Sequence, residues 1–379
     1  MLSNSDFPLI QIQTNSCCAS ATDQPGKFVP DFNQPFVSGF VETPVGRLPR
    51  VSSKPTRQDQ WGTVKARLTA FRMDYKIDPG LYALGHPDNH SPVFVSANYK
   101  MSFDYLRQAL AGRSGWILVL DTKGINVWCA AGKGTFGTDE LVRRIESSGM
   151  KKIVSHRKLI LPQLGAPGVA AHKVKQLSGF HVQYGPVRAE DLPAYLDAGC
   201  KATETMRIKT FDWKERAELI PIELIAAIKP FLLLAAAFLI ISGMIGPSGF
   251  WNNVTHIGVF AVFALLGAVI GGTVIHPLLL PYLPWRAFSI KGFAIGFAVT
   301  LMLLYLRGMD LFTWSGKIEA LAWLMIVPAI SGYLAMNFTG CSTYTSLSGV
   351  KKEMRWALPL EMTSVAVGIF MWLGAVLIS

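Results

Sequence analysis

The chain has 379 residues, a net charge of +11 and a hydrophobic content of 50%. Its charge is unevenly distributed, since residues 1–218 carry 28 of the 36 Lys and Arg residues and 20 of the 25 acidic ones. We therefore predict a soluble N-terminal part and a membrane-embedded C-terminal part, with a basic excess that suits anionic lipid or an acidic partner. Aromatic residues are not interleaved with Lys and Arg as on nucleic-acid surfaces, so we expect no nucleic-acid partner.

The cysteine pattern excludes several kinds of site. The five cysteines are Cys17, Cys18, Cys129, Cys200 and Cys341. The absence of a CxxC motif argues against an iron–sulfur or zinc site of ordinary spacing built from this chain alone, and the odd count argues against a disulfide scaffold. Residues 1–40 have neither the basic start nor the apolar stretch of a signal peptide. Residues 1–60 are predicted to be a flexible extension. We interpret its Cys17–Cys18 pair as incidental, with a relay of thiophilic metal as the alternative.

Strand and helix patterns alternate along the second half of the soluble part. We predict strands at residues 92–98, 116–121, 152–156 and 180–184, and helices at 102–110, 138–148, 169–177 and 189–197. This spacing is typical of a mostly parallel sheet with helices on its faces, and so of an α/β Rossmann-like domain over residues 61–218. The loops that follow the strands are expected to converge on one crevice, where such sheets bind ligands.

Five apolar stretches follow, at residues 230–245, 254–275, 287–306, 318–336 and 357–378. Each approaches the ~20 residues that cross a bilayer core, so residues 219–379 are predicted to form an all-α domain of five transmembrane helices. Pro230 is expected to end or kink the segment at residues 219–229, which we interpret as a juxtamembrane helix that lengthens the first span. Lys and Arg favour the loops on the side of the soluble domain, which indicates a multi-pass protein of the cytoplasmic (inner) membrane with that domain in the cytoplasm. Ionisable residues are expected only at span ends, which argues against an ion-coupled transporter.

One short tract carries the most chemical information. Asn126 is a suitable helix N-cap and Gly134 a suitable C-terminal stop, which predicts a two-turn helix between them. Cys129 then lies in the first turn, near the positive end of the helix dipole, with Lys133 one turn further on. A cysteine in this position could bind a soft metal ion or act as a nucleophile. The alternative is a buried structural cysteine, the usual environment of a free thiol.

A glycine pattern in the same region invites a different interpretation. Residues 132–137 read formally as GxGxxG, which occurs in dinucleotide-binding domains. The first glycine, however, lies about a dozen residues beyond the preceding strand, and His156, Arg157 and Lys158 stand where the acidic residue is expected. We therefore treat nucleotide binding as an alternative, and expect these glycines only to break the loop.

The tract NVWCAAGK, residues 126–133, resembles residue for residue the signature of the mercury-methylating corrinoid proteins, the HgcA family. Residues 121–126, 159–168 and 184–189 are similar to the corrinoid-binding domain that this family shares with corrinoid iron–sulfur proteins. A soluble corrinoid domain followed by five membrane spans is also the layout of the family. The corrinoid iron–sulfur proteins have a cysteine-rich cluster motif and lack these spans, so the chain departs from them on both counts.

The resemblance implies a membrane-bound, corrinoid-dependent methyltransferase. It would transfer a methyl group from a methyl-cobalt(III) corrinoid to Hg(II), with methylmercury as the product. The cofactor would be a cobalamin-type corrinoid bound base-off, with Cys129 as the catalytic residue and lower axial ligand of cobalt. A thiolate donates more electron density than benzimidazole or water, which favours release of the methyl group to an electrophile.

The resemblance also implies a set of cofactor-binding residues. Asn126 would hold the start of the helix, Trp128 would pack the helix against its support, and Ala130 and Ala131 would keep the approach to the ring open. The complete helix set is Asn126, Val127, Trp128, Cys129, Ala130, Ala131, Gly132 and Lys133. The pocket for the nucleotide tail would be lined by Ser96, Leu161, Pro162, Gln163, Leu164, Gly165, Ala166, Tyr184, Gly185, Pro186 and Arg188.

Partners follow from the same resemblance. A small ferredoxin-like protein with two 4Fe–4S clusters would return electrons and deliver mercury, and a methyltetrahydrofolate-linked enzyme would donate the methyl group. The lack of cluster ligands in this chain independently requires an external reductant. Two other functions stay open: a corrinoid methyl carrier of one-carbon metabolism with a different acceptor, and a membrane anchor or transporter with a regulatory nucleotide domain.

Overall fold

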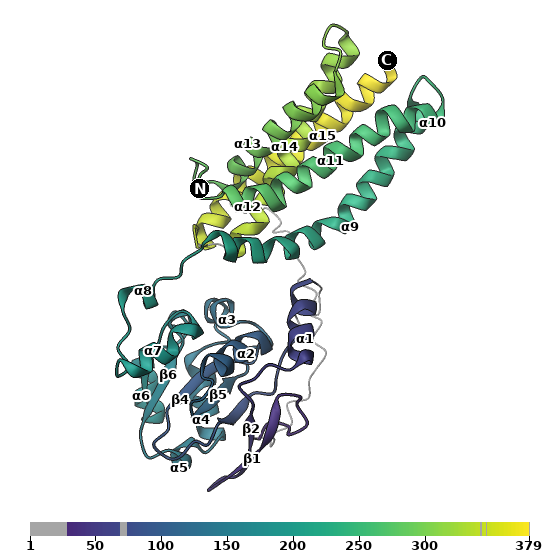
Figure 1. Cartoon of the computed structure of the whole chain (residues 1–379). Helices are drawn as coiled ribbons and strands as arrows, with labels where there is room; N and C mark the ends of the chain where they lie inside the picture. The colour runs from purple at the N-terminus through teal and green to yellow at the C-terminus, as the bar shows by residue number, and fades with distance from the viewer. Residues whose placement is uncertain (1–28, 69–73, 342, 346, 379) are drawn as a thin grey trace, which may run out of the picture.

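The computed structural model describes residues 29–68, 74–341, 343–345 and 347–378. They form a mixed α/β sheet domain followed by a helical region, which stands above the sheet domain in Figure 1. The predicted fold class is therefore confirmed: the sheet has seven strands, and the helical region holds five helices long and apolar enough to cross a membrane. Cys17 and Cys18 lie outside the described residues.

The sheet has the strand order β1-β2-β3-β5-β4-β6-β7. Four strands, β5, β4, β6 and β7, pair in parallel, while β3 pairs antiparallel with β5. Every residue of β3, β4 and β5 is buried, because helices cover both faces of the sheet and the central strands are accordingly apolar runs. The strands are β1 Val37–Thr43, β2 Gly46–Val51, β3 Gly80–Leu84, β4 Val93–Ala97, β5 Gly115–Leu120, β6 Lys158–Leu161 and β7 His181–Tyr184.

Helices on the two faces bury two separate apolar cores. One core contains Leu118 and Phe136, and the other contains Ile117 and Phe103, because successive residues of β5 point to opposite faces. The helices are α1 Arg57–Leu68, α2 Lys100–Ala109, α3 Val127–Lys133, α4 Thr138–Ser147, α5 Met150–Ile153, α6 Ala171–Ser178, α7 Leu192–Asp197 and α8 Glu204–Arg207, with short 3-10 turns η2 Gln163–Gly165 and η3 Ala189–Asp191.

The strand predicted at residues 152–156 is wrong. The structure has a helical turn, α5, at Met150–Ile153, and the strand follows at Lys158–Leu161. Met150 and Ile153 are both buried, and their spacing of three places them on one side of a helical turn. The short apolar run was therefore assigned the wrong period, and the true strand lay partly in the segment predicted to be a loop.

The N-terminal edge of the sheet lies within the segment that we expected to be an extension. Strands β1 and β2 form an antiparallel hairpin, and Arg50 and Val51 of β2 pair in parallel with β3. The side chains of β1 alternate between half-buried and exposed, which is the pattern of an edge strand with one face on the domain. The sheet thus begins before residue 61, and that residue lies inside α1 rather than at a boundary.

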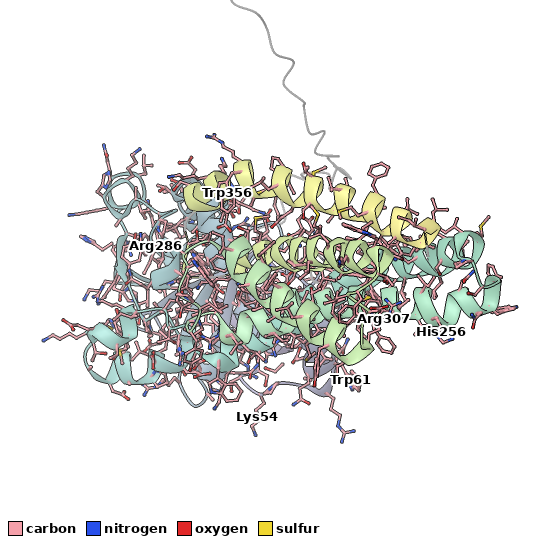
Figure 2. The ribbon with its side chains drawn as sticks, turned by 90° about the horizontal axis from the view of Figure 1, so that it is seen from above. Lys54, Trp61, His256, Arg286, Arg307 and Trp356 are labelled. Carbon is pink, nitrogen blue, oxygen red and sulfur yellow. The ribbon has the colours of Figure 1, made fainter. Side chains whose placement is uncertain are left out.

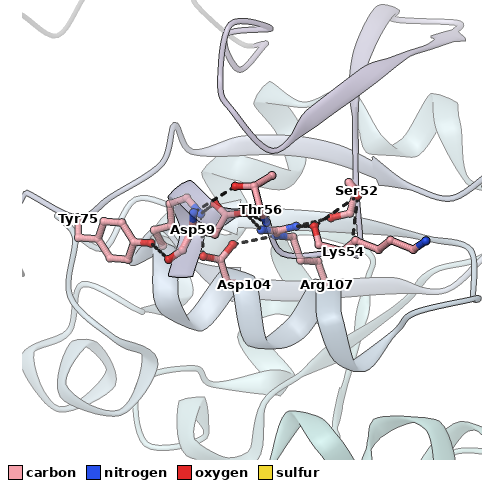
Figure 3. Close-up of polar contacts among 8 residues, drawn as sticks. Ser52, Lys54, Thr56, Asp59, Tyr75, Asp104 and Arg107 are labelled. Carbon is pink, nitrogen blue, oxygen red and sulfur yellow. Dashed lines mark hydrogen bonds and ion pairs between the residues drawn. The ribbon is translucent and has the colours of Figure 1, made fainter. Parts of the chain in front are cut away.

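A buried charge network attaches α1 to α2 (Figure 3). Lys100 Nζ lies 2.6 Å from Asp59 Oδ1 and 2.7 Å from Asp104 Oδ2. Arg107 contacts the same two carboxylates at 2.8 Å each, and its Nη1 donates to the carbonyl groups of Ser52 and Lys54. All four charged side chains are at most 10% exposed, so this network joins the N-terminal segment firmly to the sheet domain.

The five apolar helices are α9 Trp213–Ile245, a composite helix Phe250–Leu279, α13 Phe288–Arg307, α14 Trp314–Asn337 and α15 Leu347–Ile378. The composite helix contains α10 Phe250–Asn253, α11 Val259–Ile270 and α12 His276–Leu279, joined by two π-helical turns. Pro230 does not end α9: the helix continues through it, so residues 219–229 belong to the same helix as the first apolar stretch. Figure 1 shows the start of α9 running beneath the bundle before the helix turns upward.

Some polar side chains are buried in the bundle near the end that faces the sheet domain. Lys291 Nζ donates to Leu280 O at 2.7 Å, and Glu353 Oε1 accepts from Ser289 N at 2.6 Å. His276 is fully buried between the rings of Phe288 and Phe338. The end of the bundle that faces the sheet domain therefore contains buried ionisable side chains, and their hydrogen-bond partners were not recognisable from the sequence.

Candidate functional site

The loop that follows β5 is fixed by the end of the neighbouring strand. Asn98, directly after β4, accepts three hydrogen bonds on its Oδ1: from Thr122 N at 3.0 Å, Thr122 Oγ1 at 2.8 Å and Gly124 N at 2.9 Å. Lys123 and Gly124 both adopt positive φ values, which such a tight turn requires. Asn98 thereby determines where α3 begins, although the sequence pattern indicated it only as the last residue of the strand predicted at 92–98.

Helix α3 has the caps that the sequence predicts. Asn126 is extended, and its Oδ1 accepts a hydrogen bond from Cys129 N at 2.9 Å. Gly134 ends the helix with a φ of 80°, in the left-handed region. The Cys129 side chain is exposed on the first turn, so the alternative of a buried structural cysteine is wrong.

The opposite side of α3 is packed against the loop that follows β6. Ala130 and Ala131 are buried in the core, so they support the helix and do not border an open approach as we expected. A methyl group at Gly165 would lie 2.5 Å from the Phe136 ring, and one at Gly168 would overlap Phe136 O and lie 3.0 Å from Ala131 Cα. Small residues on both sides therefore allow the two backbones to approach closely.

A cavity of about 880 Å³ lies beside α3, at the carboxyl ends of β4, β6 and β7. Ten predicted binding residues line it: Ser96, Asn126, Val127, Trp128, Leu161, Pro162, Leu164, Gly185, Pro186 and Arg188. Nine others do not line it: Cys129, Ala130, Ala131, Gly132, Lys133, Gln163, Gly165, Ala166 and Tyr184. The structure therefore brings most of the predicted tail pocket together with the start of α3, whereas the Cys129 thiol is exposed and follows the lining residue Trp128 without itself lining the cavity.

Several predicted residues differ in role from what we expected. Trp128 is 37% exposed and lines the cavity, so it does not pack α3 against its support. Tyr184 donates from its hydroxyl to Val169 O at 2.7 Å, and burial raises its pKa. Gln163 N donates to Pro186 O at 3.4 Å, and Gly185 N donates to Leu161 O at 2.8 Å. These two hydrogen bonds join the loops after β6 and β7, and the joined loops form one wall of the cavity.

The second wall of the cavity was missed by sequence analysis. It is formed by α2, the linker before α9 and the first turns of α9, including Tyr105, Lys209 and Glu215. Asp212 caps α9 by accepting from Glu215 N at 2.9 Å, and this backbone hydrogen bond lowers the pKa of Asp212. An Asp followed three residues later by Glu is a recognisable helix start, but nothing local indicates that this helix start faces β6 and β7.

The glycine pattern does not form a phosphate-binding turn. Gly132 and Gly134 lie at the end of α3, and Gly137 caps α4, so the pattern connects two helices. A dinucleotide fingerprint instead connects a strand directly to a helix. The structure thus agrees with the expectation that these glycines break the loop.

The arrangement suits a metal that brings most of its own ligands. Within the described ranges, no three His, Cys, Asp or Glu side chains are grouped so that they could hold a metal ion. Cys129 nevertheless presents an exposed sulfur beside a large cavity. A macrocyclic metal cofactor needs only one ligand from the protein on one face, which this geometry offers.

Comparison with known proteins finds similarity within the sheet domain. Residues 65–196 match the family model of the CO dehydrogenase/acetyl-CoA synthase delta subunit. Gamma subunits of the acetyl-CoA decarbonylase/synthase complex are also similar: the one of Methanopyrus kandleri is 30% identical over 128 residues, that of Archaeoglobus fulgidus 29% over 128, and that of Methanocaldococcus jannaschii 34% over 100.

The similarity is limited to one part of each protein. For the first two relatives it covers 33% of this chain and 27% of the relative, and for the third 25% and 20%. The family match begins inside α1 and ends in α7. It therefore includes the strands and loops around α3, but neither α9 nor the other apolar helices.

Proposed function

We propose that the chain is a membrane-bound corrinoid protein that transfers a methyl group to Hg(II), with methylmercury as the product. The observation that carries this proposal is the exposed Cys129 on a doubly capped helix beside the 880 Å³ cavity. The NVWCAAGK tract supports Hg(II) as the acceptor, because it resembles the mercury-methylating family. Relatedness to subunits of a CO dehydrogenase/acetyl-CoA synthase supports one-carbon chemistry in general.

The residues present fit a corrinoid. Cys129 would hold the cobalt of the cofactor through its sulfur, and the loops after β4, β6 and β7 would hold the cofactor's nucleotide tail. When bound, the corrinoid supplies a cobalt centre that accepts and releases methyl groups. Asn126 fixes the height of Cys129 through the bond to its backbone N–H, and Asn98 fixes the loop that leads into the helix.

The sheet domain, which begins with β1, lies in the cytoplasm together with the linker, and the five apolar helices from α9 onward cross the inner membrane. A ferredoxin-like protein with two 4Fe–4S clusters returns electrons, and a methyltetrahydrofolate-linked enzyme supplies the methyl group.

A second candidate is a corrinoid methyl carrier of one-carbon metabolism with a different acceptor. Its support is the similarity of the sheet domain to gamma subunits of acetyl-CoA decarbonylase/synthase complexes. The five apolar helices and the NVWCAAGK tract favour the mercury proposal over this one.

The test is Cys129→Ala, with Cys200→Ala as the matched control, because Cys200 is a half-buried thiol packed against the apolar core, whereas Cys129 is exposed on α3. In anaerobic protein loaded with corrinoid, Cys129→Ala should change the absorption spectrum and lower methylmercury formation by at least 10²-fold. Cys200→Ala should leave both unchanged.

The outcomes separate the candidates. Normal methylmercury formation by Cys129→Ala would contradict the role of Cys129 as axial ligand. A wild-type protein that binds corrinoid and accepts a methyl group, but never transfers it to Hg(II), would favour the carrier of one-carbon metabolism.

A further inference from the structure

One carboxylate of α9 is held firmly beside the cavity by its neighbours. Glu215 Oε1 lies 3.1 Å from Arg188 Nη2 and 2.5 Å from Lys209 Nζ. Arg188 comes from the loop after β7, and Lys209 from the linker, so three segments meet at this oxygen. Arg188 also donates to Thr210 Oγ1. The orientation of the Glu215 carboxylate is therefore determined by contacts on one side only.

The second oxygen of the same carboxylate, Oε2, differs from Oε1 in its hydrogen bonding. Glu215 Oε2 is buried and accepts no hydrogen bond from the residues that the structure describes. Glu215 itself lines the cavity. A buried charged acceptor without a donor is costly, and such groups in native proteins are normally satisfied by protein, water or ligand.

We propose that Glu215 Oε2 accepts a hydrogen bond from an N–H donor of the molecule that occupies the cavity. This inference rests on the proposed function, because a corrinoid carries carboxamide side chains at its periphery, and these are N–H donors. The first apolar helix would then contribute directly to the cofactor site, instead of serving only as an anchor. The cofactor would in turn stabilise the contact between the sheet domain and α9.

Glu215→Gln keeps one oxygen acceptor and replaces the other with an –NH₂ donor. Arg188 and Lys209 are both donors, so they retain the amide oxygen, and the amide –NH₂ then faces the cavity. The –NH₂ group of the variant and the N–H donor of the bound molecule would then face each other, so the hydrogen bond to position 215 would be lost. Glu204→Gln is the matched control, because Glu204 lies on α8 of the same linker and does not line the cavity.

The experiment titrates full-length protein in detergent with aquacobalamin. Binding is followed by quenching of tryptophan fluorescence, to which Trp128 in the cavity wall contributes, and by the corrinoid retained after gel filtration. Because a hydrogen bond to a charged group is worth roughly 1.5–3 kcal/mol, Glu215→Gln should raise the Kd about 10- to 100-fold. Glu204→Gln should bind like the wild type.

Trypsin cleavage of the ligand-free proteins in the linker, after Lys201 and Arg207, provides the second measurement. Equal cleavage of Glu215→Gln and wild type is expected, since the amide oxygen still accepts from Arg188 and Lys209. Faster cleavage of ligand-free Glu215→Gln would make Glu215 a structural anchor and overturn the inference. Equal Kd values would overturn it while leaving the proposed function intact, whereas a wild-type protein that retains no aquacobalamin would overturn both.

Discussion

Two asparagines position the Cys129 thiol, and neither sits on the helix that carries it. Asn98 holds the loop after β5 through three donors, and Asn126 caps α3 through the backbone N–H of Cys129 itself. A short helix has little stability of its own, so its place is determined by these end contacts. The sulfur consequently projects from a defined point although its side chain is exposed.

The buried charge network also changes the pKa of Asp59. Burial alone would raise its pKa, but hydrogen bonds from Lys100 and Thr56 N, together with the charges of Lys100 and Arg107, lower its pKa to about 2. A carboxyl whose pKa is lower in the folded state contributes stability above its unfolded pKa of 3.8. That contribution should be lost as the pH falls from about 4 to about 2.

Asp59→Asn leaves Lys100 and Arg107 with one carboxylate between them, in a buried site. We expect the free energy of unfolding of the sheet domain to fall by roughly 3–5 kcal/mol, as for other buried ion pairs that lose one partner. Denaturant titrations at neutral pH and near pH 3 measure it, and the loss should be smaller at the lower pH. The control is Glu42→Gln, which removes an exposed pair with Arg47 and should cost at most about 1 kcal/mol. Equal losses for both variants would contradict this account.

At the scale of elements, α3 rests on the loop between β6 and α6 through small residues. Gly168 lies beside the backbone of Ala131 and Phe136, Gly165 lies beside the Phe136 ring, and Thr138 Oγ1 accepts from Ala170 N at 2.9 Å. Both the helix and the loop border the cavity, so any displacement between them changes the distance from the sulfur to the occupant. The glycines of this loop thus matter for packing rather than for ligand contact.

Gly168→Ala should disturb this packing. Its methyl group would overlap the backbone at Phe136, so we expect a loss of roughly 1–3 kcal/mol in stability and weaker corrinoid binding. Gly132→Ala, on α3, is the contrasting variant, since nothing lies within 4 Å of its added methyl group. It should be neutral or stabilise α3 by up to about 1 kcal/mol. Thermal unfolding of both variants checks this, and a Gly168→Ala protein as stable as Gly132→Ala would refute the packing argument.

At the scale of the whole molecule, the two ends of the helical bundle differ in character. Figure 2 shows Arg286 and Trp356 toward one end and His256 and Arg307 toward the other. The first end also carries Lys351, Lys352 and Arg355 and faces the linker, where the Phe211 and Phe338 rings pack 5.9 Å apart. Exposed Trp285 at this end and exposed Trp251 and Trp314 at the other are typical of membrane interfaces.

This asymmetry predicts the orientation in the membrane. The end beside the sheet domain carries more Lys and Arg in its loops, so it should lie in the cytoplasm, with the C-terminus outside. Alkaline phosphatase, which is active only outside the cytoplasm, should be active when fused after residue 378 or 310 and inactive after residue 284. Fluorescent-protein fusions at the same positions should give the opposite pattern, and a reversal of both sets would exclude the proposed orientation.

Features that depend on residues close together in the chain could be predicted from the sequence, whereas features that depend on distant residues could not. The caps of α3 depend on residues three to eight positions apart, so Asn126 and Gly134 were recognisable, as were the five apolar stretches, whose length alone meets the requirement of a bilayer. The edge strands β1 and β2, the helical turn at Met150–Ile153 and the core position of Ala130 were not recognisable, because each depends on a partner elsewhere in the chain.

The local chemistry of this protein is thus written in contiguous segments: a thiol near a helix N-terminus, and apolar runs of membrane length. Only the tertiary structure decides that Asn98 holds the loop before that helix, and that Glu215 of α9 faces the loops after β6 and β7. These contacts join residues far apart in the chain, and hydrophobic burial and sheet pairing bring them together without any signal at the residues themselves.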